Sequence, residues 1–112
     1  MSEFFSEVFQ RDKHRCVYCG RGLMLDFDTF MLAQEDHLIP KSKGGPHESD
    51  NIVTSCMVCN LLKGNYVPSR QYEKEKHQEF IADIRQHIMK RRAEKMADFI
   101  SWTHPAKRTE EP

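Results

Sequence analysis

Residues 36–64 bring together side chains that could bind a metal ion and carry out acid–base chemistry. A carboxylate and an imidazole are adjacent at Asp36-His37, a glycine turn follows, and asparagines stand at Asn51 and Asn60. The second asparagine directly follows a C-x-x-C pair, and another such pair lies upstream. These residue types predict a catalytic divalent-metal site beside a structural zinc site.

The two cysteine pairs, Cys16/Cys19 and Cys56/Cys59, account for all 4 cysteines of the chain. The two residues between each pair of sulfurs allow both to reach one ion, and Gly20 can adopt the positive φ that the first turn requires. Four protein ligands leave no open coordination position, so the predicted zinc is structural. The alternative is free cysteines or two local disulfides.

The length and charge of the chain limit what it can do alone. Its 112 residues suit one domain with a small core, which a bound metal would help to stabilise. The 17 basic residues balance the 17 acidic ones, so no overall positive field attracts a polyanion. Any contact with nucleic acid must therefore come from a local basic patch.

No segment resembles a membrane anchor or a leader. No apolar run approaches the roughly 18 residues that suggest a membrane span. The first residues lack the basic region and apolar core of a signal peptide. We therefore expect a cytoplasmic, reducing setting without membrane contact, in which paired cysteines bind metal more readily than they form disulfides.

A helix and an extended segment are predicted before the Asp-His pair. Ser2 can cap a first helix whose apolar face holds Phe4, Phe5, Val8 and Phe9. Residues 23–30 alternate only in part, so a strand and a turn at 26–28 are both compatible with them. Residues 30–35 are expected to extend towards Asp36-His37.

A strand, loop, strand and helix are predicted around the reactive residues. Leu38-Ile39 is β-prone, residues 41–50 form a loop, and 51–54 form a short second strand. Residues 57–63 suit a short helix, and Gly64 is placed to end it. The fold class is therefore α+β.

The last third of the chain predicts a long helix over about residues 72–100. Its apolar stripe consists of Ile81, Ile84, Ile88, Ala93, Met96 and Ile100. Within it, Lys90-Arg91-Arg92 is either a solvated face or a phosphate contact. Residues 1–102 are expected to form one domain, and the polar residues 103–112 a flexible tail.

Taken together, these motifs resemble the C-x-x-C-containing branch of the HNH endonuclease family. The similarity covers about residues 10–68 and implies the ββα-metal (His-Me finger) fold, with helices on both flanks. The matching elements are Arg11-Asp12, C-x-Y-C-G at 16–20, D-H-L-I-P at 36–40, K-x-K-G-G at 41–45, D-N-I-V at 50–53 and C-x-x-C-N-x-x-K-G at 56–64.

The resemblance implies a role for each matching residue. His37 stands where the family has its general base, and Asp36 where it has a carboxylate ligand for a divalent ion. Asn60 occupies the third signature position, which also reaches that ion, so the chain is an H-N-N variant. Two hard oxygen ligands suit Mg²⁺ or Mn²⁺. Asn51 is the middle asparagine, which orients the base through hydrogen bonds.

One geometric condition follows from strand structure. Adjacent residues on a regular strand point to opposite faces, so Asp36 and His37 can act on one phosphate only if the strand ends or bends there.

The implied function is metal-dependent hydrolysis of phosphodiester bonds in nucleic acid, most simply DNA. Lys41, Lys43 and Lys63 are candidates for contacts with backbone phosphates. The alternative is a non-catalytic zinc module that binds nucleic acid or a protein. Because the net charge is zero, the chain could act as a homodimer or be delivered by a larger complex.

Overall fold

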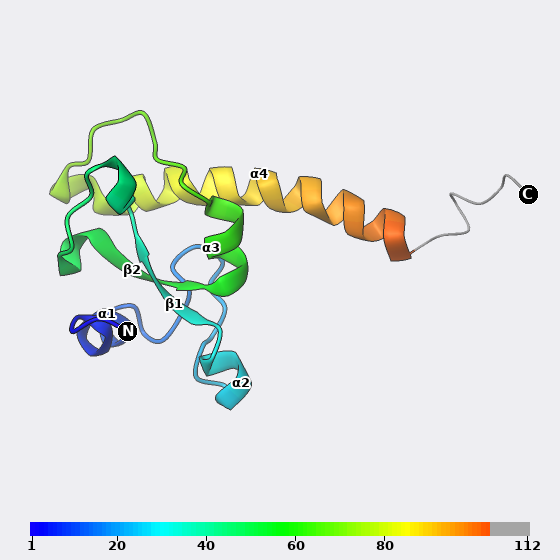
Figure 1. Ribbon diagram of the computed structural model, residues 1–112, viewed down its shortest axis with the longest axis horizontal. Coiled ribbons are helices and arrows are strands. Elements are labelled where there is room, and N and C mark those ends of the chain that lie inside the picture. The colour runs from blue at the N-terminus through cyan, green and yellow to red at the C-terminus, as the bar shows by residue number, and fades with distance from the viewer. Residues whose placement is uncertain (104–112) are drawn as a thin grey trace, which may run out of the picture.

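The computed structural model describes residues 1–103, which form a small α+β unit around a two-stranded antiparallel sheet (Figure 1). The predicted fold class is therefore confirmed. In chain order the elements are α1 (Phe5–Arg11), α2 (Phe27–Phe30), β1 (Ala33–His37), the 3-10 turns η1 (Lys41–Lys43) and η2 (Ser49–Asn51), β2 (Ile52–Cys56), α3 (Met57–Lys63), the 3-10 turn η3 (Lys74–Lys76) and α4 (His77–Thr103).

The strands β1 and β2 pair from Ala33 opposite Cys56 to His37 opposite Ile52. Every residue of β2 is buried, whereas in β1 only Ala33 and Asp36 are fully buried. A regular strand therefore runs through both Asp36 and His37, and their side chains leave it on opposite faces. Beyond the last pair, the amide of Leu38 donates to the carbonyl of Asn51 at 2.8 Å.

The helix α4 closes the core on one side of the sheet. Its first half buries four apolar side chains, and its second half extends beyond the rest of the molecule (Figure 1). The buried side chains are Phe80, Ile81, Ile84 and Ile88, which join Tyr18, Leu23, Leu38 and Val53 in one cluster. The helix also contacts α3.

Three predicted elements differ from the observed ones. The first helix begins at Phe5, later than a cap at Ser2 predicts, although Oγ of Ser2 accepts from the amide of Phe4 at 3.2 Å. The amide and hydroxyl of Ser2 also donate to the carboxylate of Glu35. Neither a strand nor a simple turn forms at residues 23–30, because Asp26 caps the short helix α2 by accepting from the amide of Thr29 at 2.7 Å.

The long helix α4 begins at His77 rather than near residue 72, and it continues without a break to Thr103. The tail expected from residue 103 lies, beyond that residue, outside the described part of the chain. Within residues 1–103, no helix has both the length and the apolar character needed to cross a membrane.

Replacing Ile84 should test how firmly α4 is anchored. Ile84 is fully buried, so Ile84→Ala should lower the free energy of unfolding by about 2–5 kcal/mol because it leaves a cavity. Met96→Ala on the same helix is the control, since Met96 is 44% exposed. Met96→Ala should lower the free energy of unfolding, measured by urea denaturation, by less than about 1 kcal/mol. Equal losses for both variants would contradict this view of α4.

Candidate active site beside a four-cysteine metal centre

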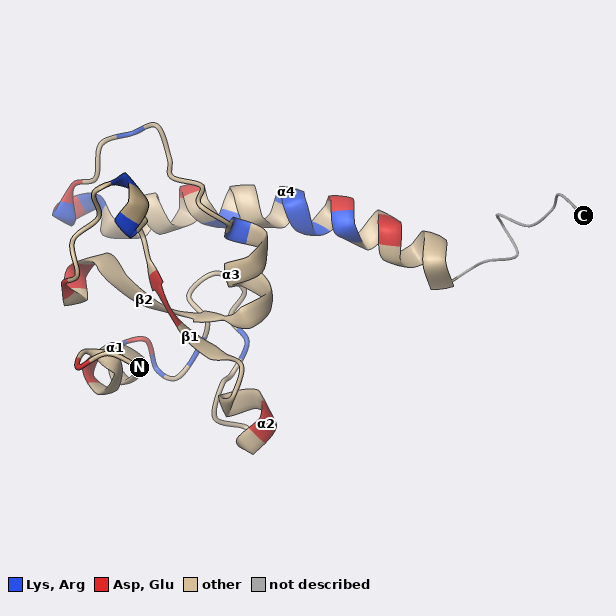
Figure 2. Ribbon diagram, viewed as in Figure 1, with Lys and Arg blue, Asp and Glu red and all other residues tan. Residues whose placement is uncertain are grey.

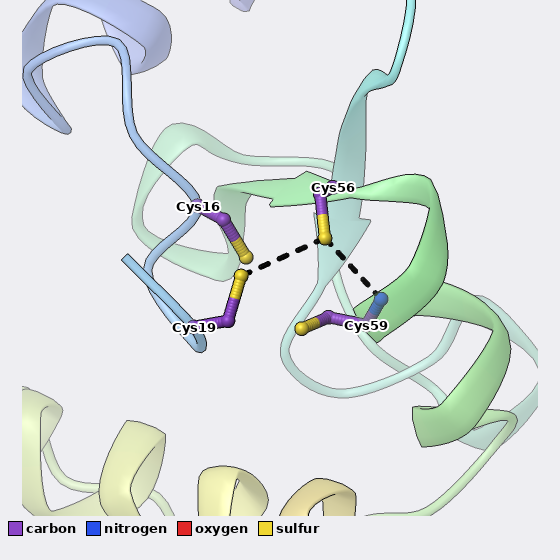
Figure 3. A group of neighbouring side chains, drawn as sticks. All are labelled: Cys16, Cys19, Cys56 and Cys59. Carbon is purple, nitrogen blue, oxygen red and sulfur yellow. Dashed lines mark hydrogen bonds between the residues drawn. The ribbon is translucent and has the colours of Figure 1, made fainter. Parts of the chain in front are cut away.

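The four cysteines converge from two parts of the chain (Figure 3). Cys16 and Cys19 flank a tight turn in which the amide of Gly20, at φ +79°, donates to the carbonyl of Cys16 at 2.9 Å. Cys56 ends β2 and caps α3, where its sulfur accepts from the amide of Cys59 at 3.4 Å. The ligand atoms all lie within 4.8 Å of one another.

This geometry fits a structural zinc ion. Four sulfurs bound tetrahedrally at about 2.3 Å from zinc would lie about 3.8 Å from one another. The sulfurs of Cys19 and Cys56 are 3.8 Å apart. Hydrogen bonds from Cys56 and then Cys59 lower the pKa of the Cys16 thiol, while the bond with Cys16 raises the pKa of Cys56 and of Cys59. A metal bound here would displace the remaining thiol protons. Within residues 1–103 this is the group of His, Cys, Asp and Glu residues placed to hold an ion.

The helix α4 supports the metal-binding turn from outside. The guanidinium of Arg85 donates to the carbonyl of Tyr18 at 2.8 Å and to that of Val17 at 2.6 Å. On the other side, the amide of Val17 donates to the carbonyl of Thr54 in β2 at 3.0 Å. The turn is therefore held between the sheet and α4, so its position does not depend on the metal alone.

The carboxylate of Asp36 is occupied by two buried partners. Its Oδ1 lies 3.1 Å from the ammonium group of Lys63 and its Oδ2 accepts from the hydroxyl of Tyr18 at 2.5 Å. Burial raises the pKa of Asp36, and the attraction of Lys63 and the bond from Tyr18 oppose that rise. Burial also raises the pKa of Tyr18, so its hydroxyl remains a donor.

Lys63 does not occupy the surface position predicted for a phosphate contact. It is only 2% exposed, and its ammonium group also donates to the carbonyl of His37 at 2.8 Å. A buried ammonium group must be paired, and Asp36 is the carboxylate within reach. Lys63 therefore connects α3 to β1 from inside the fold, and a contact with substrate from the surface does not fit this placement.

Asp36 and Asn60, the residues expected to bind a catalytic Mg²⁺ or Mn²⁺, both offer oxygen donors of the right kind. The amide nitrogen of Asn60 donates to Gln34 at 2.5 Å, which leaves its amide oxygen as a possible metal ligand. The ammonium group of Lys63, however, lies 3.1 Å from Oδ1 of Asp36. A positive charge on that carboxylate opposes the approach of a divalent cation. Asp36 as placed therefore does not fit this ion.

His37 points away from Asp36 and is partly exposed at the end of β1. Its Nε2 lies 3.2 Å from Nδ1 of His47, and the two rings stack with centroids 5.4 Å apart. Burial, followed by the positive charge of Lys41 and the electrostatic effect of His47, lowers the pKa of His37. The lowered pKa keeps the ring neutral near pH 7, the form that can accept a proton from water.

Asn51 joins the strand that carries His37 to the loop that follows it. Its Oδ1 accepts from the amide of Ile39 at 3.0 Å, and its Nδ2 donates to the carbonyls of Ile39 at 3.1 Å and Pro46 at 2.9 Å. The loop lies so close here that a Cβ on Gly45 would be 1.7 Å from the carbonyl oxygen of Ile39. The oxygen and the nitrogen of the Asn51 side-chain amide thus both fix the backbone around His37.

Two exposed lysines flank this region. Lys41 and Lys43 lie on η1, directly after the segment that carries His37 (Figure 2). A second group of basic residues lies on the middle of α4, where Lys90 is exposed (Figure 2).

Sequence reasoning missed two contributors. Tyr18 stands between the first two cysteines, where its burial against Asp36 depends on the folded sheet. No sequence motif includes His47, although its distance of ten residues from His37, across a glycine turn, is compatible with a loop that folds back.

Comparison with known proteins agrees with this geometry. Residues 16–66, which contain both cysteine pairs and the strand–loop–strand–helix unit, match the model described as HNH endonuclease. This segment is of the HNH family. The resemblance predicted from the sequence is therefore confirmed.

A relative shares part of the HNH segment. The CRISPR-associated endonuclease Cas9 of Corynebacterium diphtheriae is 35% identical over 57 residues, which are 50% of this chain and 5% of that protein. The chain therefore corresponds to a small fraction of the length of this relative. No solved structure matches the chain.

Removing one cysteine should separate metal binding from the rest of the fold. Cys56→Ser should lower the bound zinc from about one ion per chain and destabilise the whole domain, because metal binding is coupled to folding. Elemental analysis and thermal melting measure the two effects. A variant that melted like the parent protein would contradict a structural zinc site.

Removing the charge of Lys63 should lower the free energy of unfolding far more than removing the charge of a surface lysine. Lys63→Met leaves the buried carboxylate of Asp36 without its ionic partner, which should cost about 3–5 kcal/mol of unfolding free energy. Lys43→Met, at an exposed position of the same residue type, should change it by less than about 0.5 kcal/mol. Similar urea-denaturation curves for the two variants would show that the buried pair does not form.

Proposed function

We propose that this chain is a nuclease of the HNH type that hydrolyses phosphodiester bonds in nucleic acid, with DNA as the substrate and His37 as the general base. The observation that carries the proposal is the placement of His37. Its imidazole is partly exposed at the end of a regular strand, with a lowered pKa, inside a segment of the HNH family.

The proposed reaction needs a water molecule and a held phosphate. His37 takes a proton from the water, whose oxygen forms a bond to phosphorus while the bond from phosphorus to the 3′ oxygen breaks. The leaving oxygen takes a proton from solvent. The ammonium groups of Lys41 and Lys43 are proposed to hold the phosphate backbone, because both are exposed on the turn that follows the His37 segment.

The role proposed for Asn51 is to keep the base in position. Its three hydrogen bonds tie the backbone two residues after His37 to the loop at Pro46. A general base works only if its ring stays within reach of the proton that it accepts. Asn51 is therefore a positioning residue in this proposal and makes no contact with the substrate.

The resemblance also implies Mg²⁺ or Mn²⁺ at Asp36 and Asn60, but the arrangement described above does not fit such an ion, and no step is assigned to it. Binding there would require the ammonium group of Lys63 to leave Asp36. Activity that requires a divalent metal would therefore imply that the ion pair between Lys63 and Asp36 opens when the metal binds. The plasmid-cleavage assay includes Mg²⁺ and Mn²⁺ for this reason.

A non-catalytic zinc module is the second candidate. Two observations favour it: the carboxylate of Asp36 is enclosed, and the net charge is zero. A free-standing nuclease of neutral charge would bind DNA weakly, which also favours a homodimer or delivery by a larger complex. The segment shared with Cas9 is a small part of that protein, in line with delivery.

Plasmid cleavage by the zinc-loaded protein distinguishes the two functions. The parent should convert supercoiled plasmid to the nicked form, and His37→Ala should slow this by about 100-fold or more, because a positioned general base contributes about 10²–10⁴. His87→Ala, which removes an imidazole on α4 that stacks on Tyr66 rather than on His37, should cleave like the parent.

The assay should be run with Mg²⁺, with Mn²⁺ and with a chelator too weak to remove the zinc. Cleavage by the parent and by His37→Ala at equal rates would contradict the role of His37. Absence of cleavage with retained DNA binding would favour the non-catalytic module.

A further inference from the structure

We propose that His47, held by Glu3, is a positioning residue that fixes the orientation and the proton of the His37 imidazole. The catalytic part of this inference rests on the proposed function of His37. The contact between His37 and His47 does not depend on that function. The inference assigns a role to residues 2–4, which lie outside every motif described above.

The N-terminal segment lies against the face of β1 that carries His37. Glu35 and His37 are two residues apart and so share this face. The backbone amide of Ser2 donates to Oε1 of Glu35 at 2.8 Å, and its hydroxyl donates to Oε2 of the same carboxylate. These bonds fix the segment beside the end of the strand, so the next residues can reach the loop after β1.

Glu3 and Phe4 hold the ring of His47 in place. Oε1 of Glu3 lies 3.5 Å from Nε2 of His47, and the Phe4 ring packs against the imidazole with centroids 5.3 Å apart. Asn51 holds the preceding residue by donating to the carbonyl of Pro46 at 2.9 Å. His47 is therefore restrained through its backbone and on both sides of its ring, although it is exposed.

The contacts also define which nitrogen carries each proton. The carboxylate of Glu3 lies 3.5 Å from Nε2 of His47 and so favours a proton on that nitrogen, which leaves Nδ1 of the ring to accept a hydrogen bond. His37 must then donate its own Nε2 proton across the 3.2 Å contact. Nδ1 of His37, which has no hydrogen-bond partner among residues 1–103, is left to accept a proton from water.

The arrangement is a chain of carboxylate, imidazole and imidazole that ends at the proposed base. In such a chain, the outer groups set the tautomer and the ring orientation of the inner one. The chain predicts that loss of His47 lowers the catalytic rate by misplacing the base, while the affinity for substrate, which is assigned above to Lys41 and Lys43, changes little.

The test compares His47→Ala, His47→Asn and Glu3→Gln with the parent and with His87→Ala. Nitrogen-15 NMR of the imidazoles reports the tautomer of His37 at a pH where the ring is neutral. The parent and His87→Ala should show the proton on Nε2. His47→Ala should give a mixture of tautomers, and His47→Asn should keep the parent state, because an amide oxygen can accept the same bond.

The kcat for cleavage, measured on the same samples, should fall in the variants in which the His37 tautomer changes. We expect kcat to fall roughly 10- to 100-fold in His47→Ala with KM nearly unchanged, to fall less in Glu3→Gln, and to recover in His47→Asn. Zinc content and melting temperature should match the parent in the variants of His47 and Glu3, since these two side chains are exposed.

An unaltered His37 tautomer in His47→Ala would overturn the inference whatever the activity. A shifted tautomer in a protein that cleaves nothing would uphold the contact and refute the nuclease. A shifted tautomer with unchanged kcat in a cleaving protein would show that the contact does not position the base.

Discussion

The four-cysteine centre is the constraint on which the rest of the structure depends. A two-stranded sheet is marginal by itself, and the described core is small. Cys56 ends β2 and starts α3, so an ion bound by the four cysteines would tie the loop that carries Cys16 to the point where strand becomes helix. Arg85 on α4 donates to two carbonyls of the same loop. The ion and Arg85 together would thus hold three parts of the chain.

The second constraint is the regularity of β1. Because neighbouring side chains on β1 point to opposite faces, Asp36 points into the interior and the next residue, His37, points towards the surface. The interior side chain forms a buried pair with Lys63, and the surface side chain meets His47. The two functions that the resemblance assigns to neighbouring residues, binding a metal and accepting a proton, are therefore separated by the sheet in this arrangement.

Local features were predictable from the sequence, and most contacts between distant residues were not. The helix at 57–63 with its stop at Gly64 follows from a short-range pattern. The convergence of the two distant cysteine pairs is the exception, because C-x-x-C spacing indicates a shared metal ion. The bond from Ser2 to Glu35, far along the chain, follows from no local pattern. The burial of Lys63 depends on a carboxylate from another element, and a lysine usually lies at the surface.

The central claim is that the surface around His37 is where nucleic acid binds. The most direct measurement is an NMR titration of the zinc-loaded protein with a short DNA duplex, followed at backbone amides and at the histidine rings. The account predicts that the largest shifts fall on His37, on His47 and on the turn that carries Lys41 and Lys43. Shifts confined to the basic residues of α4, or no binding at all, would contradict it.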